Sequence, residues 1–267
     1  MRNLVDHDAR RFGAVNWMGL YTLANRETMR FLTVWTQTLL APLVTAGLFL
    51  LIFTIAIGPS RPDVMGVPFV VFLAPGIMMM TVIQNAFANT SSSMVIAKVQ
   101  GNIVDTLMPP LSPLEIMLGY LAGGIARGTL IACVVAAAFL VFRSIAPQNP
   151  FVTLVFVFLG GAFMGALGLF AGIFANKFDQ MAAITNFIVT PLAFLSGTFY
   201  SVQALPPVLN MISHVNPVFY LIDGLRFGMI GVSDSSPLLG FVVCSLATVL
   251  VCTVTWWMLR KGYRLKA

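Results

Sequence analysis

The sequence predicts an all-α integral membrane protein with six transmembrane helices, an amphipathic interfacial helix at the N-terminus and short re-entrant extracytoplasmic helices between spans five and six. Of its 267 residues, 58% are hydrophobic and only 9% are charged, whereas ordinary soluble domains carry roughly 25% charged residues. The charges divide the chain into six apolar intervals, each long enough to cross a hydrocarbon layer of about 30 Å. Between Gln180 and Ile222 no charge occurs, yet several prolines interrupt the segment, which is typical of a span that breaks and partly re-enters.

Residues 1–31 are predicted to form a cytoplasmic N-terminus. They contain several arginines but no continuous apolar core, so they do not resemble a cleavable signal peptide. Apolar residues recur at helical spacing from Trp17 to Phe31, while Asn25, Arg26 and Arg30 fall on other faces. This pattern predicts an amphipathic helix at the cytoplasmic interface. The helix would anchor the N-terminus or would also form part of a docking surface for a cytoplasmic partner.

The transmembrane domain is predicted over residues 32–259. The first crossing runs near 32–57 and ends at the Gly58-Pro59 breaker. The second, near 67–97, is longer than a membrane needs and carries Pro75-Gly76. It also carries a polar stripe at intervals of three and four residues, formed by Thr81, Asn85, Asn89 and Ser92. Hydrogen bonds between helices would explain this stripe. The alternative is that it faces a polar pathway or the interface between protomers.

Spans three (about 115–142) and four (about 151–176) contain glycines at intervals of four. Small residues at this spacing let helix backbones approach closely, either within one subunit or at a protomer interface. Arg127 lies well inside span three, where an ionised side chain is costly unless it is paired or reaches water. It would snorkel or bond to carbonyls, or else contribute to substrate or gating chemistry.

The fifth span is expected between Asp179 and Asp223, and the last near 237–259, followed by a cytoplasmic tail at 260–267. With the N-terminus inside, most basic residues are cytoplasmic and few are outside, as the positive-inside rule requires. The inside set is Arg2, Arg10, Arg11, Arg26, Arg30, Lys98, Lys177, Arg260, Lys261, Arg264 and Lys266; the outside set is Arg61, Arg143 and Arg226. We therefore expect a multi-pass protein of the bacterial plasma (inner) membrane with both termini cytoplasmic.

The net charge of +6 is explained by this topology and by anionic lipid, so we expect the lipid bilayer, and no nucleic acid, as a partner. The cysteines, Cys133, Cys244 and Cys252, fall in predicted spans and are interpreted as small packing residues. They imply no disulfide framework.

Two short helices are predicted within the extracytoplasmic segment 197–235. Pro206 and Pro207 suit the first turn of one helix, Asn216-Pro217 stops it, and residues 218–230 form the second. Asp223 and Arg226 are three residues apart, so they can pair on one helix face and lower the cost of charge near the outer interface. The two helices would be a structural plug or an outer gate for an exported substrate.

Two stretches resemble type-2 permeases of ATP-binding cassette (ABC) exporters, including those of drugs, lipid-linked saccharides or polysaccharides. The first is the loop at 98–114, which is similar to the cytoplasmic coupling loop of that family through Gln100, Asp105, Leu107, Pro110, Leu111, Ser112, Pro113 and Glu115. The second is similar to the long family signature after span five. It comprises Pro191, Ser196, Gly197, Phe199, Tyr200, Leu205, Pro206, Asn216, Pro217, Tyr220, Asp223 and Arg226.

This resemblance implies a permease subunit that dimerises, most simply as a homodimer, and that docks on a separate cytoplasmic ABC ATPase through the coupling loop. Substrate would pass between protomers along the first, second and fifth spans. The candidate pathway residues are Thr36, Gln37, Gln84, Asn85, Asn89, Asn186 and Thr190. No cofactor is expected in this chain, since ATP and Mg would bind the ATPase subunit.

Absent motifs exclude several other functions. No G-x-x-x-x-G-K-[ST] phosphate-binding loop occurs, so the chain is not expected to hydrolyse ATP. No carboxylate is predicted deep inside a span, which argues against a proton- or sodium-coupled carrier. The histidines, His7 and His214, belong to no H-E-x-x-H motif, and no G-x-S-x-G occurs, so neither an enzyme nor a metal site is expected. The alternative function is an ATPase-independent secondary transporter, channel or flippase-like subunit.

Overall fold

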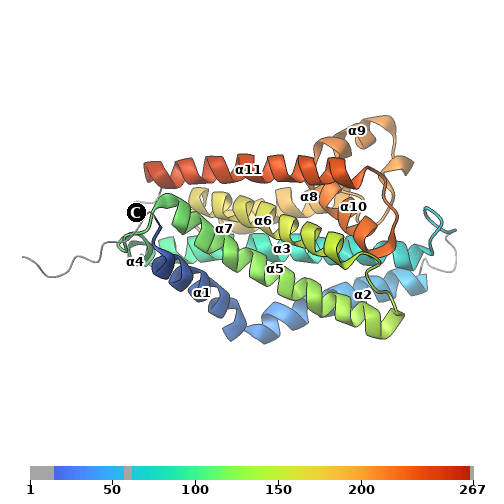
Figure 1. The fold of residues 1–267 in the computed structure, drawn as a ribbon, viewed down its shortest axis with the longest axis horizontal. Helices are drawn as coiled ribbons and strands as arrows, with labels where there is room; N and C mark the ends of the chain where they lie inside the picture. The colour runs from blue at the N-terminus through green and yellow to red at the C-terminus, as the bar shows by residue number, and fades with distance from the viewer. Residues whose placement is uncertain (1–14, 57–61, 265–267) are drawn as a thin grey trace, which may run out of the picture.

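A computed structural model describes residues 15–56 and 62–264, and the regular elements of these residues are helices arranged as an elongated bundle (Figure 1). Within these ranges, six helices are long and apolar enough to cross a membrane: Thr36–Ala56, Phe69–Val99, Pro113–Arg143, Pro150–Phe174, Phe178–Leu195 and Pro237–Lys261. Five of them match the predicted spans to within a few residues at each end, and the fifth span, Phe178–Leu195, occupies the first part of the predicted interval between Asp179 and Asp223. The predicted N-terminal arginines of residues 1–14, the Gly58-Pro59 breaker, Arg61 and Lys266 lie outside the described residues.

Two of the six spans are not regular α-helices. The first begins with a π-helical turn, η1 (Thr36–Leu40), before α2 (Ala41–Ala56), and a separate helix, α1 (Trp17–Thr33), precedes it. The fifth consists of α7 (Phe178–Ile184), a second π-helical turn, η3 (Thr185–Val189), and α8 (Thr190–Leu195). The other spans are α3 (Phe69–Val99), α5 (Pro113–Arg143), α6 (Pro150–Phe174) and α11 (Pro237–Lys261).

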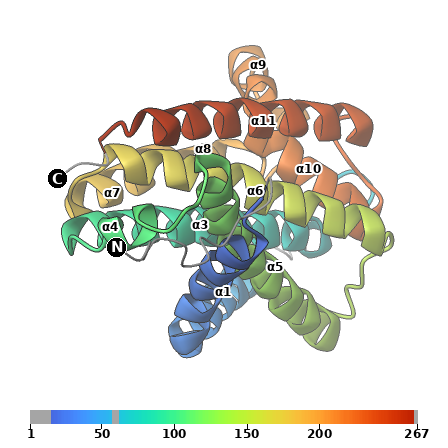
Figure 2. The same cartoon turned by 60° about the vertical axis from the view of Figure 1, so that its left-hand side comes forward.

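Short helices mark the two ends of the bundle. α4 (Ile103–Leu107) lies beside the start of α1 at one end, whereas α9 (Pro207–Val215) and α10 (Pro217–Ile230) lie at the opposite end, which is also where η4 (Val202–Ala204) occurs (Figures 1 and 2). These ends are called the α4 end and the α9 end below. The two short helices predicted from Pro207 and Pro217 therefore exist at the predicted positions. α10 is almost entirely buried among its neighbours.

The centre of the bundle is formed by α3 and α6, whose apolar windows are 78% and 67% buried, whereas those of the first, fifth and last spans are only 11%, 17% and 17% buried. Glycines on α5 and α6 make this packing possible. A Cβ on Gly168 of α6 would lie 2.4 Å from the Phe87 carbonyl oxygen of α3, and one on Gly124 of α5 would lie 3.0 Å from Thr90. The glycine spacing thus serves close packing within one subunit, the first of the two alternatives from the sequence.

Hydrogen bonds at the α4 end explain where several helices start and stop. Ser112 and Glu115 form a reciprocal capping box at the start of α5, which satisfies two backbone donors that the helix leaves free. At the C-terminal end of α6, Lys98 donates to the carbonyl oxygens of Ile173 and Ala175, both at 2.8 Å. A cation at a helix C-terminus is favourable, so Lys98 ties α3 to α6.

Candidate functional site

The predicted coupling loop is an exposed connection at the α4 end. Its helix α4 buries Ile103 and Thr106 against the bundle and turns Asp105 outward. The side chains of Leu107 and Met108 are 42% and 77% exposed. Other predicted loop residues are also exposed: Gln100, Pro110 and Ser112, with Pro113 half-buried at the start of α5.

The loop is fixed to the N-terminal helix through Glu115. This carboxylate is buried and accepts the backbone N–H of Asn16 at 2.5 Å and that of Ser112 at 2.6 Å. The Asn16 amide also donates to the Pro110 carbonyl at 3.3 Å. Between α1 and the loop lies a groove of about 280 Å³ that is lined by Met18, Gly19, Thr22, Asp105 and Pro109, among others. Coupling loop and N-terminal helix therefore form one surface.

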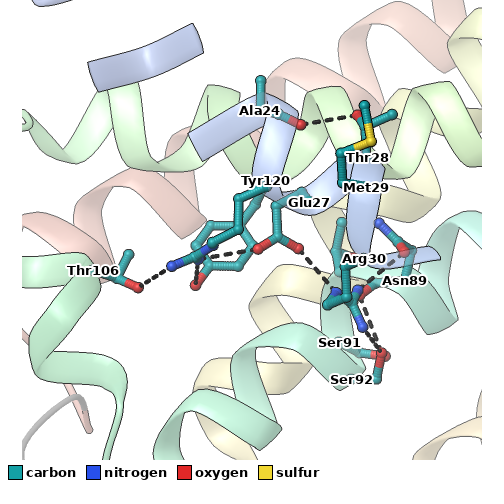
Figure 3. Close-up of polar contacts among 12 residues, drawn as sticks. Ala24, Glu27, Thr28, Met29, Arg30, Asn89, Ser91, Ser92, Thr106 and Tyr120 are labelled. Carbon is teal, nitrogen blue, oxygen red and sulfur yellow. Dashed lines mark hydrogen bonds and ion pairs between the residues drawn. The ribbon is translucent and has the colours of Figure 1, made fainter. Parts of the chain in front are cut away.

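A polar network joins α1, α3, α4 and α5 next to this surface (Figure 3). Glu27 of α1 is 1% exposed and lies 3.1 Å from the Arg26 guanidinium and 3.4 Å from that of Arg30. Arg26 reaches Thr106 of α4 at 3.2 Å, and Arg30 reaches Asn89 of α3 at 2.7 Å. Because the Arg26–Thr106 and Arg30–Asn89 bonds cross between elements, the network connects the coupling loop to the second span.

The polar face of α1 differs from the simple amphipathic prediction. Arg26 and Arg30 were expected on faces turned away from the apolar side. In the structure they reach back to the bundle, while Trp17 and Tyr21 are more than 70% exposed. The physical reason is Glu27, a buried charge that needs cationic partners. The signal for this arrangement in the sequence is an acidic residue, Glu27, close to two arginines on one predicted helix.

The predicted polar stripe of α3 makes contacts within the chain. Asn89 is completely buried and Thr81 nearly so. Asn85 accepts a hydrogen bond from Arg127 at 2.8 Å, and Ser92 accepts one from Arg30 at 3.4 Å. These bonds correspond to the interhelical explanation of the stripe. The remaining pathway candidates are more open: Thr36, Gln37 and Asn186 are exposed, and Gln84 and Thr190 are half-buried.

The predicted signature residues gather at the α9 end around Arg226. This side chain is fully buried and lies 3.6 Å from Asp223, as predicted, and 3.7 Å from Asp234, which was not predicted. It donates to the Gly197 carbonyl at 2.6 Å and stacks over the Phe72 ring of α3 at 4.0 Å. One guanidinium thus joins α10, the loop after α8, the loop before α11 and the second span.

The two carboxylates around Arg226 are themselves held by donors. Asp223 accepts the backbone N–H groups of Asp234 at 2.7 Å and Ser235 at 2.8 Å. Asp234 accepts the hydroxyl of Ser201 and the backbone N–H of Val202. Charge-assisted hydrogen bonds of this kind are among the stronger ones in proteins. These signature residues therefore form a buried network of ion pairs and hydrogen bonds around Arg226.

The other signature residues shape the same corner. Asn216 caps α10, since its side chain accepts from Val218, and its amide donates to the Ser196 hydroxyl at 2.7 Å. Phe199 packs its ring 5.7 Å from Phe49 and 5.0 Å from Phe53 of the first span, and 5.5 Å from Phe194 of the fifth. Pro191 lies at the start of α8, Pro206 precedes α9, Pro217 opens α10, Tyr220 is buried in α10, and Tyr200 donates to the Phe194 carbonyl.

Among the described residues, no group of three or more His, Cys, Asp and Glu side chains is placed to hold a metal ion. His214 lies in α9, where its ring contacts the Asn210 carbonyl at 2.9 Å and packs against Phe219. This is a local structural role.

Comparison with known proteins gives one family. Residues 18–230 match the model of the ABC-2 type transporter family. The inner membrane transport permease YadH of Escherichia coli K12 is 36% identical over 252 residues, which cover 94% of this chain and 98% of YadH. Nodulation protein J of Neorhizobium galegae is 23% identical over 85% of this chain and 86% of its own length. The corresponding protein of Sinorhizobium fredii is 28% identical over 62% of this chain.

Proposed function

The chain belongs to the ABC-2 type transporter family and is a multi-pass transport permease of the inner membrane; from this premise we propose that it is the membrane subunit of an exporter driven by a separate cytoplasmic ATPase. Two copies form the translocation pathway between them. ATP and Mg²⁺ bind the ATPase subunit, and this chain supplies no catalytic group.

The observation that carries this proposal is the surface at the α4 end. A partner must contact groups that are exposed, and the coupling loop presents Asp105, Leu107 and Met108 beside the groove under α1. The positive-inside rule supports a cytoplasmic location for the same end, because Arg26, Lys98, Lys177 and Arg264 lie there. α1 then lies at the cytoplasmic interface with Trp17, Met18 and Tyr21 available to lipid or the ATPase.

The polar network offers a route by which ATPase movement reaches the span. α4 is bonded to α1 through Thr106 and Arg26, and α1 is bonded to α3 through Arg30 and Asn89. A shift of α4 would therefore move α1 and α3 together, as a near-rigid body motion. At the opposite end, α9 and α10 dip back from the periplasmic side, and the network around Arg226 holds the outer gate.

The test is the substitution Asp105→Lys, which reverses an exposed charge on α4 without removing a bond of the network. We expect normal membrane insertion and a loss of substrate-stimulated ATPase activity of about tenfold. The reason is that reversing a charge at an interface replaces an attractive contact by a repulsive one, which weakens binding by about 1 kcal/mol or more. ATPase activity is measured with the permease and the ATPase co-purified. Asp63→Lys, the same charge reversal at an exposed position before α3 and outside the coupling loop, is the matched control.

Two results would contradict the proposal. If Asp105→Lys left substrate-stimulated ATPase activity unchanged while the complex remained intact, α4 would not be part of the interface with the ATPase. Uphill transport by the purified permease alone in liposomes would favour the alternative, an ATPase-independent secondary transporter, channel or flippase-like subunit.

A further inference from the structure

Two arginines from different helices bind neighbouring turns of α3. Arg30 of α1 donates to the carbonyl and side-chain oxygens of Asn89 at 2.7 and 3.0 Å, as Figure 3 shows. Arg127 of α5 donates to the side-chain oxygen of Asn85 at 2.8 Å. Asn85 and Asn89 are four residues apart, so they lie on the same face of the helix, about one turn or 6 Å apart along its axis. The two guanidinium groups are therefore neighbours.

The positive charge of this pair is not balanced within the described part of the chain. Glu27 is the carboxylate of the network, and it is shared by Arg26 and Arg30. Arg127 makes no ion pair with any described residue, and its Nε atom is buried without a hydrogen-bond partner. An unpaired cation inside a span is costly. A mobile anion bound at this position would remove that cost.

The depth of Arg127 indicates which anion can reach it. Gly123 of α5 packs against Glu27 of α1, since a Cβ there would lie 2.6 Å from the Glu27 Cβ. Arg127 is four residues, or about 6 Å, further along α5. Because α1 lies at the membrane surface in the proposed orientation, Arg127 lies just inside the level of the lipid headgroups.

The surroundings of Arg30 are also suited to a lipid. Arg30 lines a groove of about 400 Å³ together with the apolar side chains of Met29, Ile96 and Ala97. The groove also contains Arg26 and the carboxylates of Glu27 and Asp105. Glu27 is already paired with two arginines, and Asp105 lies on α4. Beside α3, the groove therefore combines the Arg30 cation with the apolar side chains of Ile96 and Ala97.

We propose that Arg30 and Arg127 bind the phosphate group of an anionic phospholipid of the cytoplasmic leaflet. Guanidinium groups present paired N–H donors that match phosphate oxygens. The phosphate accepts donors from both arginines, while the asparagines hold the two side chains in place. The bound lipid is then a structural part of the contact between α1, α3 and α5. The depth argument and the choice of the cytoplasmic leaflet rest on the orientation in the proposed function.

The experiment measures thermal unfolding of the purified permease in nanodiscs by intrinsic tryptophan fluorescence. Discs of phosphatidylcholine alone are compared with discs that contain phosphatidylglycerol, and with phosphatidylcholine discs in buffer with added inorganic phosphate. A ligand that binds only the folded state raises Tm. We expect phosphatidylglycerol to raise Tm by about 3 °C or more and inorganic phosphate to have no effect.

Two variants test the site itself. Arg127→Gln should lose the response to phosphatidylglycerol. Asn85→Asp places a carboxylate oxygen about where the Asn85 side-chain oxygen now accepts from Arg127, so it should raise Tm in phosphatidylcholine and also lose the response. Arg143→Gln, which neutralises an exposed arginine at the other end of the same helix, is the matched control and should keep it.

Three outcomes would overturn the proposal. The first is a wild-type Tm that does not depend on phosphatidylglycerol. This outcome is measured on the wild-type protein, so it does not require any variant to fold. The second is an unchanged response in Arg127→Gln and Asn85→Asp. The third is stabilisation by inorganic phosphate alone, which would assign a soluble anion in place of the lipid. Because the assay contains no ATPase and measures no transport, its failure would leave the proposed export function untouched.

Discussion

Arg226 carries a buried positive charge between two carboxylates and over an aromatic ring. Removing one partner from a buried ion pair costs about 3–5 kcal/mol, because the remaining charge is left without compensation. We therefore expect Arg226→Gln to lower the unfolding free energy by this amount, measured as loss of Tm in detergent. Arg143→Gln, at an exposed position, is the control and should change Tm little. Equal Tm values for the two variants would mean that Asp223 and Asp234 are stable without the guanidinium.

Gly197 supplies the carbonyl that Arg226 binds, and its φ of +75° is one that other residues rarely adopt. A Cβ there would lie 2.9 Å from Val202 and 3.1 Å from the Tyr200 carbonyl oxygen. Gly197→Leu should therefore disturb the outer gate and reduce export more than it reduces abundance, measured by transport and by immunoblot. Gly66→Leu has the same backbone strain, with φ of +78°, but no atom within 4 Å of the added Cβ. If both variants exported equally, the α9 end would be a passive plug.

The residue level was partly predictable from sequence. The pair Asp223 and Arg226 follows from their spacing of three on a helix, and the structure confirms it. Asp234 could not be assigned to this network, because it follows α10 in a loop whose path depends on the whole fold. Arg127 was recognised as a costly charge, but its partner Asn85 is 42 residues away, and helix spacing says nothing about contacts at that separation.

Helix packing gives a prediction at the level of elements. A Cβ on Gly168 would lie 2.3 Å from the Thr90 hydroxyl and 2.4 Å from the Phe87 carbonyl, and a backbone oxygen has little freedom to move. Gly168→Val should separate α6 from α3 and lower stability by about 1–3 kcal/mol or more through overpacking. Tm and the folded yield after membrane extraction are measured. Gly47→Val is the matched control, since no atom lies within 4 Å of its Cβ; a similar loss in both would indicate a general effect of valine.

The elements themselves were largely predictable, because apolar length and proline positions determine where membrane helices start and stop. Pro113, Pro150, Pro207, Pro217 and Pro237 each open a helix, as expected for proline in a first turn. Glycine spacing predicted close packing, but not that α5 presents Gly119 and Gly123 to α1 while Gly124 and Gly128 face α3. That division depends on the rotation of α5 about its axis, which a cluster of adjacent glycines leaves ambiguous.

At the level of the whole molecule, the first, fifth and last spans are barely covered by the rest of the chain. In the proposed dimer, the fifth span lies at the interface between copies. We expect Phe187→Cys, at a position 81% exposed on η3, to form a disulfide-linked dimer on oxidation in membranes, in a background in which Cys133, Cys244 and Cys252 are replaced by alanine. The product is detected on non-reducing gels.

Leu238→Cys on α11, at a position 73% exposed, is the control for this experiment and should remain monomeric. Cross-linking of Leu238→Cys in place of Phe187→Cys would place the dimer contact on the last span. Composition alone could predict that the chain crosses a membrane, but not which spans remain uncovered, since the barely covered first and fifth spans differ in mean hydropathy, at 2.4 and 1.3.

The π-helical turns at η1 and η3 interrupt the first and fifth spans near polar residues. A π turn holds one residue more than an α turn, and each residue of an α-helix advances the rotation by about 100°. Converting η1 into regular α-helix by a one-residue deletion would therefore swivel all of α2 by about 100° about its own axis. Leu50 and Ala46, which now pack into the core, would point elsewhere, and the span would present a different side to its surroundings without any break in its backbone.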